Sequence, residues 1–168
     1  MIGILGVIFM TTSTSYTSDD GSAQKIQNPV KSITVELKDV SILQVSDRAA
    51  VIEIQFNLYN PNSRSVIAQL LQYSLYSSND SEEFKITTGT IGSRPEGMVD
   101  GSNYYTLLSN NSIVLKDKIV LKSPGNSPEL MSILESSNPS WRVEGDVFFN
   151  LSSMTSGQEN EIHFESRK

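Results

Sequence analysis

Hydrophobic and polar side chains alternate along most of the chain, which is the pattern of β-strands that bury one face. The clearest run is residues 51–59. Its apolar positions are Ile52, Ile54, Phe56 and Leu58, and its polar positions are Glu53, Gln55 and Asn57. Pro61 ends the run, because proline donates no hydrogen bond to a sheet and pushes the preceding residue into an extended or turn conformation. This run therefore predicts a half-buried strand that ends in a turn.

The same alternation predicts six more strands, at residues 33–43, 65–77, 84–90, 113–122, 141–151 and 161–165. In the strand at 33–43, the apolar residues change from odd-numbered to even-numbered positions near Asp39, which indicates a bulge. Residues 46–48 are expected to form a turn, so that this strand pairs with 51–59 as a hairpin. Residues 65–77 also allow a short amphipathic helix before a strand, but we expect two strand pieces joined by a bend. Gly89 and Gly92 are expected to interrupt the strand that starts at Phe84.

One helix is expected, near residues 128–137. Ser127 suits the N-cap, Pro128 the first helical position and Glu129 the first turn, where the N–H groups are exposed. The stretch from Ser137 to Pro139 stops it. A helix of this length does not stand alone in water, so it must pack against the sheets.

Composition limits the classes of function. The chain has 168 residues, of which 38% are apolar, enough for one core, and we expect one domain at residues 32–166. The formal charge of -6 and a pI near 4.8 argue against nucleic-acid binding. The absence of cysteine and the single histidine remove Cys/His zinc sites, thiol nucleophiles and disulfides.

The first ten residues form an uninterrupted apolar run, and a Ser/Thr-rich linker follows at residues 11–31. About ten residues are half of what spans a bilayer, but they match the apolar core of a signal peptide. No basic residues precede them, so part of a longer membrane anchor is a second interpretation and a first core strand is a third. We expect a secreted or membrane-anchored, extracytoplasmic protein, and a cytoplasmic one is the alternative.

The order of motifs resembles the LEA-2 family of late embryogenesis abundant proteins, which includes the WHy domain. The resemblance covers roughly residues 33–152. It rests on a strand that ends in Asn-Pro-Asn, a tyrosine-rich strand, a glycine-bearing segment, a helix and a closing strand. The matching residues are Asn60, Pro61, Asn62, Tyr73, Leu75, Tyr76, Gly89, Gly92, Val143 and Gly145. Residues 93–111 are longer than the corresponding connection and depart from the pattern.

This resemblance implies a mainly β protein, an antiparallel β-sandwich with a layout like that of immunoglobulin or fibronectin type III domains and with one short helix. It implies no catalytic, cofactor or metal site. The residues agree, because no Gly-x-Ser-x-Gly, P-loop or His-Glu-x-x-His motif is present and His163 is interpreted as a surface residue. Lys116, Lys118 and Lys122 are expected to protect a solvated face or sheet edge. Three triplets fit N-glycosylation, at Asn79, Asn110 and Asn150.

Two hypotheses of function follow. The first is a non-enzymatic stress-protection domain that shields proteins or membranes during drying, osmotic or cold stress, through weak contacts with client proteins or a membrane surface. The second is an extracytoplasmic, membrane-anchored module that binds a protein or glycan partner. An exposed apolar patch near residues 94–105 favours the second, and a uniformly polar surface favours the first. The sequence leaves the oligomeric state open.

Overall fold

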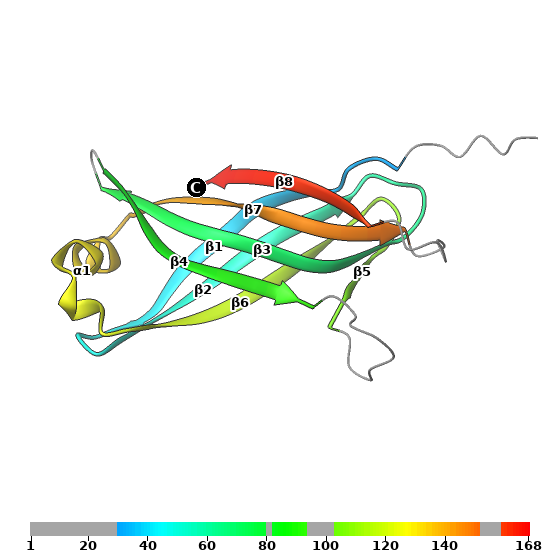
Figure 1. The fold of residues 1–168 in the computed structure, drawn as a ribbon. Coiled ribbons are helices and arrows are strands. Elements are labelled where there is room, and N and C mark those ends of the chain that lie inside the picture. The colour runs from blue at the N-terminus through cyan, green and yellow to red at the C-terminus, as the bar shows by residue number, and fades with distance from the viewer. Residues whose placement is uncertain (1–29, 80–81, 94–102, 152–158) are drawn as a thin grey trace, which may run out of the picture.

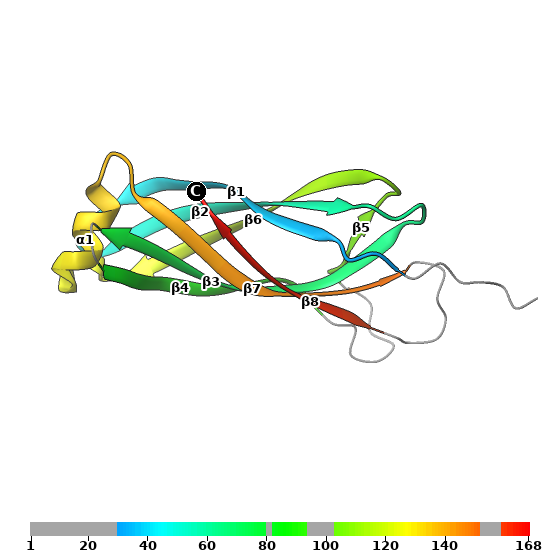
Figure 2. The ribbon, with the colours of Figure 1, turned by 90° about the horizontal axis from the view of Figure 1, so that it is seen from above.

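The computed structural model describes residues 30–79, 82–93, 103–151 and 159–168. These residues form two antiparallel β-sheets that lie face to face, as Figure 2 shows. Sheet A has the strand order β1 (Thr34–Val45), β2 (Ala49–Asn60) and β6 (Asn111–Lys122). Sheet B has the order β4 (Glu82–Gly92), β3 (Val66–Asn79), β7 (Ser140–Leu151) and β8 (Asn160–Arg167), and the short β5 (Tyr105–Leu107) pairs with β3 beyond the end of β4. The predicted antiparallel β-sandwich is confirmed.

The core lies between the two sheets and is built on β2. The four apolar residues that share one parity of this strand are all inaccessible to solvent, as their alternation predicts. The ring of Phe56 lies 4.9 Å from that of Tyr73 in β3 and 6.1 Å from that of Phe164 in β8. Burial of one such side chain stabilises the fold by about 1.5–3 kcal/mol, so these contacts hold the sheets together.

The strands differ from the sequence predictions at residues 65–77, at Gly89 and at the short β5, which was not predicted. The hairpin of β1 and β2 is confirmed, with a register shift between Leu37 and Asp39. Residues 66–79 form the single strand β3, so the helical alternative is wrong, and the expected bend is a register shift between Ala68 and Leu70. Gly89 does not interrupt β4, because it pairs with Tyr73 inside the strand. The prediction failed there because a glycine that faces a large side chain preserves the strand.

The predicted helix is α1 (Pro128–Glu135), and the Oγ of Ser127 accepts a hydrogen bond from the N–H of Leu130. It ends two residues earlier than expected, because Ser136 is already extended. A 3₁₀ turn, η1 (Pro124–Asn126), precedes it. Figure 1 shows α1 at one end of the sandwich, where the chain passes from β6 to β7. Ile133 and Leu134 are the buried residues of α1, and they pack this connection between β6 and β7 against the core.

The described chain begins at the opposite end of the sandwich from α1 (Figure 1). The predicted apolar segment 1–10 and all but the last two residues of the predicted linker 11–31 lie outside the described residues. Within the described ranges no helix is long and apolar enough to cross a membrane.

Candidate functional site

Asn60 and Asn62 form a buried joint at the end of β2. The Nδ2 of Asn60 donates to the carbonyl oxygens of Arg64, Leu107 and Leu108, at 2.8, 3.1 and 3.1 Å. Its Oδ1 accepts from the backbone N–H and the side chain of Asn62, at 3.0 and 2.9 Å. One amide side chain thus satisfies backbone groups of the β2–β3 turn and of the end of β5. The role of Asn60 is therefore to hold these two parts of the backbone together.

Asn62 binds the incoming chain. Its Oδ1 accepts from the N–H of Lys31 at 2.8 Å, and its Nδ2 donates to the carbonyl oxygen of Lys31 at 2.9 Å. The side chain thereby imitates a strand partner for one residue. Pro61 between the two asparagines is only half-buried. The Asn-Pro-Asn motif therefore fixes the place where the N-terminal arm meets the sandwich.

Tyr73 lies between two glycines, and its ring occupies the space that one of them, Gly89, leaves open. Gly89 of β4 and Gly145 of β7 pair with it on either side. A methyl group on Gly89 would collide with the phenol ring, and one on Gly145 would collide with the backbone of Gln72. The hydroxyl of Tyr73 donates a 2.7 Å hydrogen bond to Asp117 in β6 of the other sheet. Burial, together with this carboxylate, raises the pKa of Tyr73 far above its ordinary value.

The other motif residues are structural as well. Leu75 and Val143 are inaccessible to solvent and lie in the core. Gly92 has a φ of 84° at the end of β4, and a side chain there would meet the carbonyl oxygen of Gln69. A left-handed backbone with no space for a Cβ requires glycine.

Tyr76 faces the outside of sheet B, where it organises a cluster of charges. The guanidinium of Arg142 lies 4.2 Å from the centre of its ring. Arg142 binds both carboxylate oxygens of Glu83, at 2.6 and 2.7 Å, and one oxygen of Glu144 at 2.6 Å. The second oxygen of Glu144 accepts from the Tyr76 hydroxyl at 2.7 Å. Bonds to Arg142 lower the pKa of both carboxyl groups, and the bond to Glu144 raises that of Tyr76.

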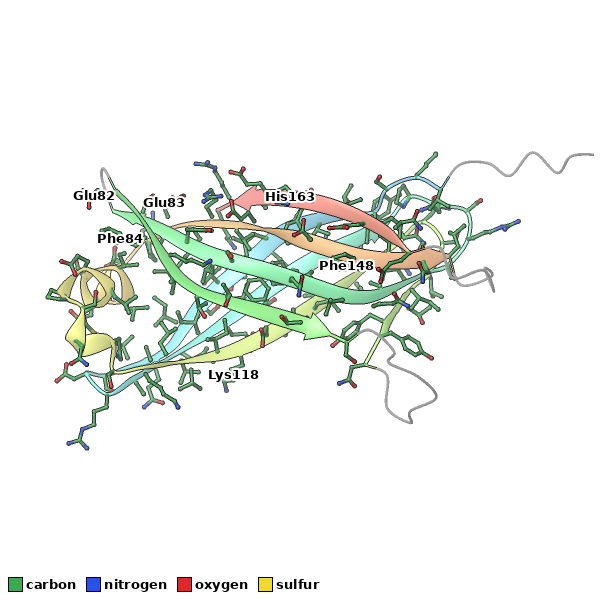
Figure 3. All side chains as sticks on the ribbon, viewed as in Figure 1. Glu82, Glu83, Phe84, Lys118, Phe148 and His163 are labelled. Carbon is green, nitrogen blue, oxygen red and sulfur yellow. The ribbon has the colours of Figure 1, made fainter. Side chains whose placement is uncertain are left out.

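An open hollow of about 660 Å³ lies beside this cluster on the outer face of sheet B. His163 stands at its rim, and its Nδ1 is 2.9 Å from the Oδ1 of Asp146. Figure 3 shows His163 on β8 and Phe148 on β7 on this side of the molecule. His163 is two-thirds exposed, as its interpretation as a surface residue requires. Asp146 is a partner that the sequence did not reveal.

The three glycosylation triplets lie in different surroundings. Asn79 is the last residue of β3. Asn110 is exposed in the turn between β5 and β6, with the left-handed φ of 50° that asparagine tolerates. Asn150 lies within β7, and its Oδ1 is buried without a hydrogen-bond partner among the described residues. Their glycosylation stays a prediction, and Asn110 is the most accessible of those whose side chains are described.

The chemistry of this face is that of hydrogen bonding. Across the described ranges, no three His, Asp or Glu side chains come together as they would around a metal ion. Glu144 is engaged by Arg142 and Tyr76, and Asp146 by His163. Fixed charges and hydroxyls on a sheet can bind and orient a polar molecule. The expected absence of a catalytic site stays an expectation.

Sequence reasoning missed the charge cluster and Asp117. Arg142, Glu144 and Asp146 alternate along β7, which marks them as one polar face, but their partners on β3, β4 and β8 depend on the strand order. The sequence does contain a signal for Asp117. It lies at the same alternating positions as the apolar Leu115 and Ile119, which are the buried positions of this strand. An acid on the buried parity indicates a partner across the core.

The sequence matches no family model and no curated protein. The fold is similar to several solved structures. A solution structure of a protein from Arabidopsis thaliana has a TM-score of 0.50 and 13% identity, with 94% of this chain and 89% of that chain covered.

Two further solved structures are less similar. A solution structure of a protein named as a putative late embryogenesis abundant (LEA) protein has a TM-score of 0.39 and 14% identity, with 83% of this chain and 70% of that chain covered. A protein from Archaeoglobus fulgidus has a TM-score of 0.39 and 12% identity, with 83% and 96% covered. At such identities the Arabidopsis likeness shows that the two chains share a fold, and it shows nothing about activity.

Proposed function

We propose that this protein is a non-enzymatic stress-protection domain that acts through its folded, polar surface. Two facts support the proposal. The motif order of residues 33–152 resembles that of the LEA-2 family, and the chain folds as the antiparallel β-sandwich that this resemblance implies. The motif residues have structural roles, as Asn60, Tyr73 and Gly145 show. Structural roles of this kind suit a protein that acts through its surface rather than through a reactive centre.

The observation that carries the proposal is the outer face of sheet B. Among the described residues, every large apolar side chain that is strongly exposed lies elsewhere. These side chains are Leu43, Tyr59, Val114 and Val120 on sheet A and Tyr104 and Leu108 beside β5. The outer face of sheet B carries instead charged and hydroxyl groups that are held in place across strands, such as the contacts of Arg142 and Glu144.

Such a surface protects by physical means. Ordered carboxylates and hydroxyls keep a hydration layer, and the net charge of -6 keeps copies of the protein apart from one another. As water is removed, a layer of these molecules between client proteins separates the apolar surfaces that would otherwise aggregate. Since the contacts are weak and polar, clients are released again on rehydration.

The experiment measures the activity of a drying-sensitive enzyme after dehydration and after freeze–thaw cycles, with this protein or an equal mass of an unrelated acidic β-sandwich domain. The proposal expects clearly more residual activity with this protein. Equal residual activity with both proteins would reject the proposed function, and the resemblance to the LEA-2 family would then concern the fold alone.

A second function is favoured by one local observation. Tyr104 and Leu108 are 49% and 56% exposed on either side of β5, within the stretch 93–111 that departs from the family pattern. Exposed side chains of this size beside a sheet edge suit a protein partner. We propose a partner site there as the alternative, tested by affinity capture with the wild type and a Tyr104→Ser, Leu108→Ser double variant. Identical captured proteins would reject this site.

A further inference from the structure

The hollow on the outer face of sheet B arises from the arrangement of side chains in rows across the strands. Its floor is the row that contains Gly89, Tyr73 and Gly145, whose side-chain positions face the core, so the floor is backbone. The row on one side carries Thr90, Gln72, Asp146 and His163, and the row on the other carries Thr88, Ser74 and Glu144. All seven of these side chains are polar.

Larger side chains occupy the next rows on either side of the hollow, outside its lining. Beyond the row of Ser74 stand Tyr76 and Arg142, stacked on each other. Beyond the row of Gln72 stand Leu70 and Phe148, which pair across β3 and β7. The hollow thus has a floor and two polar rows, and its volume of about 660 Å³ lies within the range of small-ligand sites.

The lining offers hydrogen-bonding groups of both kinds. In the described part of the structure, the side chains of Gln72, Thr88 and Thr90 make no hydrogen bond to other protein groups. The Asp146 carboxylate reaches His163 through one oxygen. Hydroxyls and the amide can donate and accept, whereas the carboxylate can only accept. A matching ligand must therefore carry several groups that both donate and accept.

Charge and polarity narrow the class of ligand. Glu144 and Asp146 disfavour an anion, and the positive charge of Arg142 is already paired with Glu83 and Glu144. Among the described residues, no three acidic or histidine side chains come together in a way that could hold a metal ion. An apolar ligand would bury hydroxyls and an amide without partners, at a cost in free energy. What remains is a neutral molecule that is rich in hydroxyl groups.

We propose that this hollow is a saccharide-binding site. Vicinal hydroxyls of a sugar ring would donate to Asp146 and exchange hydrogen bonds with Thr90, Gln72 and Thr88 above the backbone floor. The aromatic residue of the lining, Tyr73, has its side chain buried in the core, and Arg142 covers one face of Tyr76 beside the hollow. The lining therefore offers a sugar no exposed ring on which to stack. The dissociation constant is therefore expected on the order of 1–10 mM, as for a small ligand held by hydrogen bonds alone.

The test is a titration of the ¹⁵N-labelled full chain with glucose, maltose and maltotetraose, followed by nuclear magnetic resonance. The reporters are the amides of Gly89 and Gly145 in the floor, and the amide of Gly125 in η1 at the end of the sandwich serves as the internal control. The proposal expects saturating shifts at the floor glycines and none at the control. Equal affinity for the three sugars assigns the site to free saccharides, and affinity that rises with length assigns it to a glycan chain.

Two variants locate the binding. Thr90→Val and Asp146→Asn keep the size of the side chains and should each weaken binding by about fivefold or more. Thr90→Val removes a hydroxyl, and Asp146→Asn removes the negative charge and replaces one accepting oxygen by an NH₂ donor. Lys118→Gln, on the outer face of sheet A, should leave affinity unchanged. Shifts that stay linear with sugar concentration, or that are equal at Gly125, would overturn the proposal. Drying protection that Asp146→Asn leaves intact while sugar binding is lost would separate this site from the proposed protective function.

Discussion

The hydroxyl of Tyr73 in β3 donates a 2.7 Å hydrogen bond to Asp117 in β6, and this bond joins the two sheets on the side where β4 and β6 are the edge strands. On the opposite side, the Oγ of Ser166 in β8 accepts a 2.9 Å bond from the N–H of Leu37 in β1. Each long side of the sandwich is thus closed by a polar side chain. Asp117 also places an inward-pointing charge on an edge strand, which discourages pairing with another chain.

Tyr73→Phe should destabilise the protein by about 1–2 kcal/mol, because it removes this bond and leaves a half-buried carboxylate without its donor. Urea unfolding followed by fluorescence measures the change. Tyr104→Phe is the matched control, since Tyr104 is half exposed and its hydroxyl forms no such bond within the described part of the chain. A loss of stability equal to that of the control would contradict the role assigned to the bond.

Stability should fall at alkaline pH partly through Tyr73. Its folded-state pKa is raised from 10.0 by burial and by the bond to Asp117. The contribution is complete below the unfolded pKa and is lost as the pH rises above it. The difference in unfolding free energy between wild type and Tyr73→Phe should therefore shrink by up to about 1.4 kcal/mol per pH unit above pH 10. A difference that stays constant between about pH 9 and pH 11 would show that Tyr73 ionises normally.

Gly145→Ala should be more harmful than Gly89→Ala. The new methyl group at residue 145 meets the backbone of Gln72, which can move only if the pairing of β3 with β7 is disturbed, at a cost of about 3 kcal/mol or more. At residue 89 it meets the outer end of the Tyr73 ring, which can turn aside. Thermal unfolding of the two variants gives the ranking, and the reverse order would refute the packing described for Tyr73.

Asn60→Ala should cost about 2–4 kcal/mol, because three carbonyl oxygens and the N–H of Asn62 lose their partner in a buried site. Asn138→Ala provides a control of the same chemistry at an exposed position and should change stability little. Chemical unfolding of both variants checks this. If the two variants lose the same unfolding free energy, the hydrogen bonds of Asn60 do not stabilise the connection from β2 to β3.

The sequence predicts the strands well because their alternation is local. Residues 51–59 have one apolar parity, and that parity alone determines which side chains of β2 are buried. The N-cap at Ser127 is local as well, and so the helix start is right. Strand order is not local, and Glu83, Arg142 and Glu144 meet only because β4, β3 and β7 are neighbours. For that reason the charge cluster and the hollow were not predictable.

Gly89 illustrates the same limit. The sequence predicts that Gly89 interrupts the strand. In the structure it pairs with Tyr73, and only a residue without a side chain leaves room there for the Tyr73 ring. The short strand β5 escaped prediction since three residues carry no periodic pattern. Both errors concern features that depend on contacts between strands far apart in the sequence.

If the folded surface protects client proteins, protection must be lost when the chain is unfolded. A Gly145→Ala, Asn60→Ala double variant has the same net charge as the wild type and, if circular dichroism finds it unfolded, differs only in lacking the ordered surface. The measurement is the residual activity of a drying-sensitive enzyme that is dehydrated with either protein. Our account predicts strong protection by the wild type and no more than that of an inert acidic protein by the double variant. Equal protection by the folded and unfolded chains would contradict it.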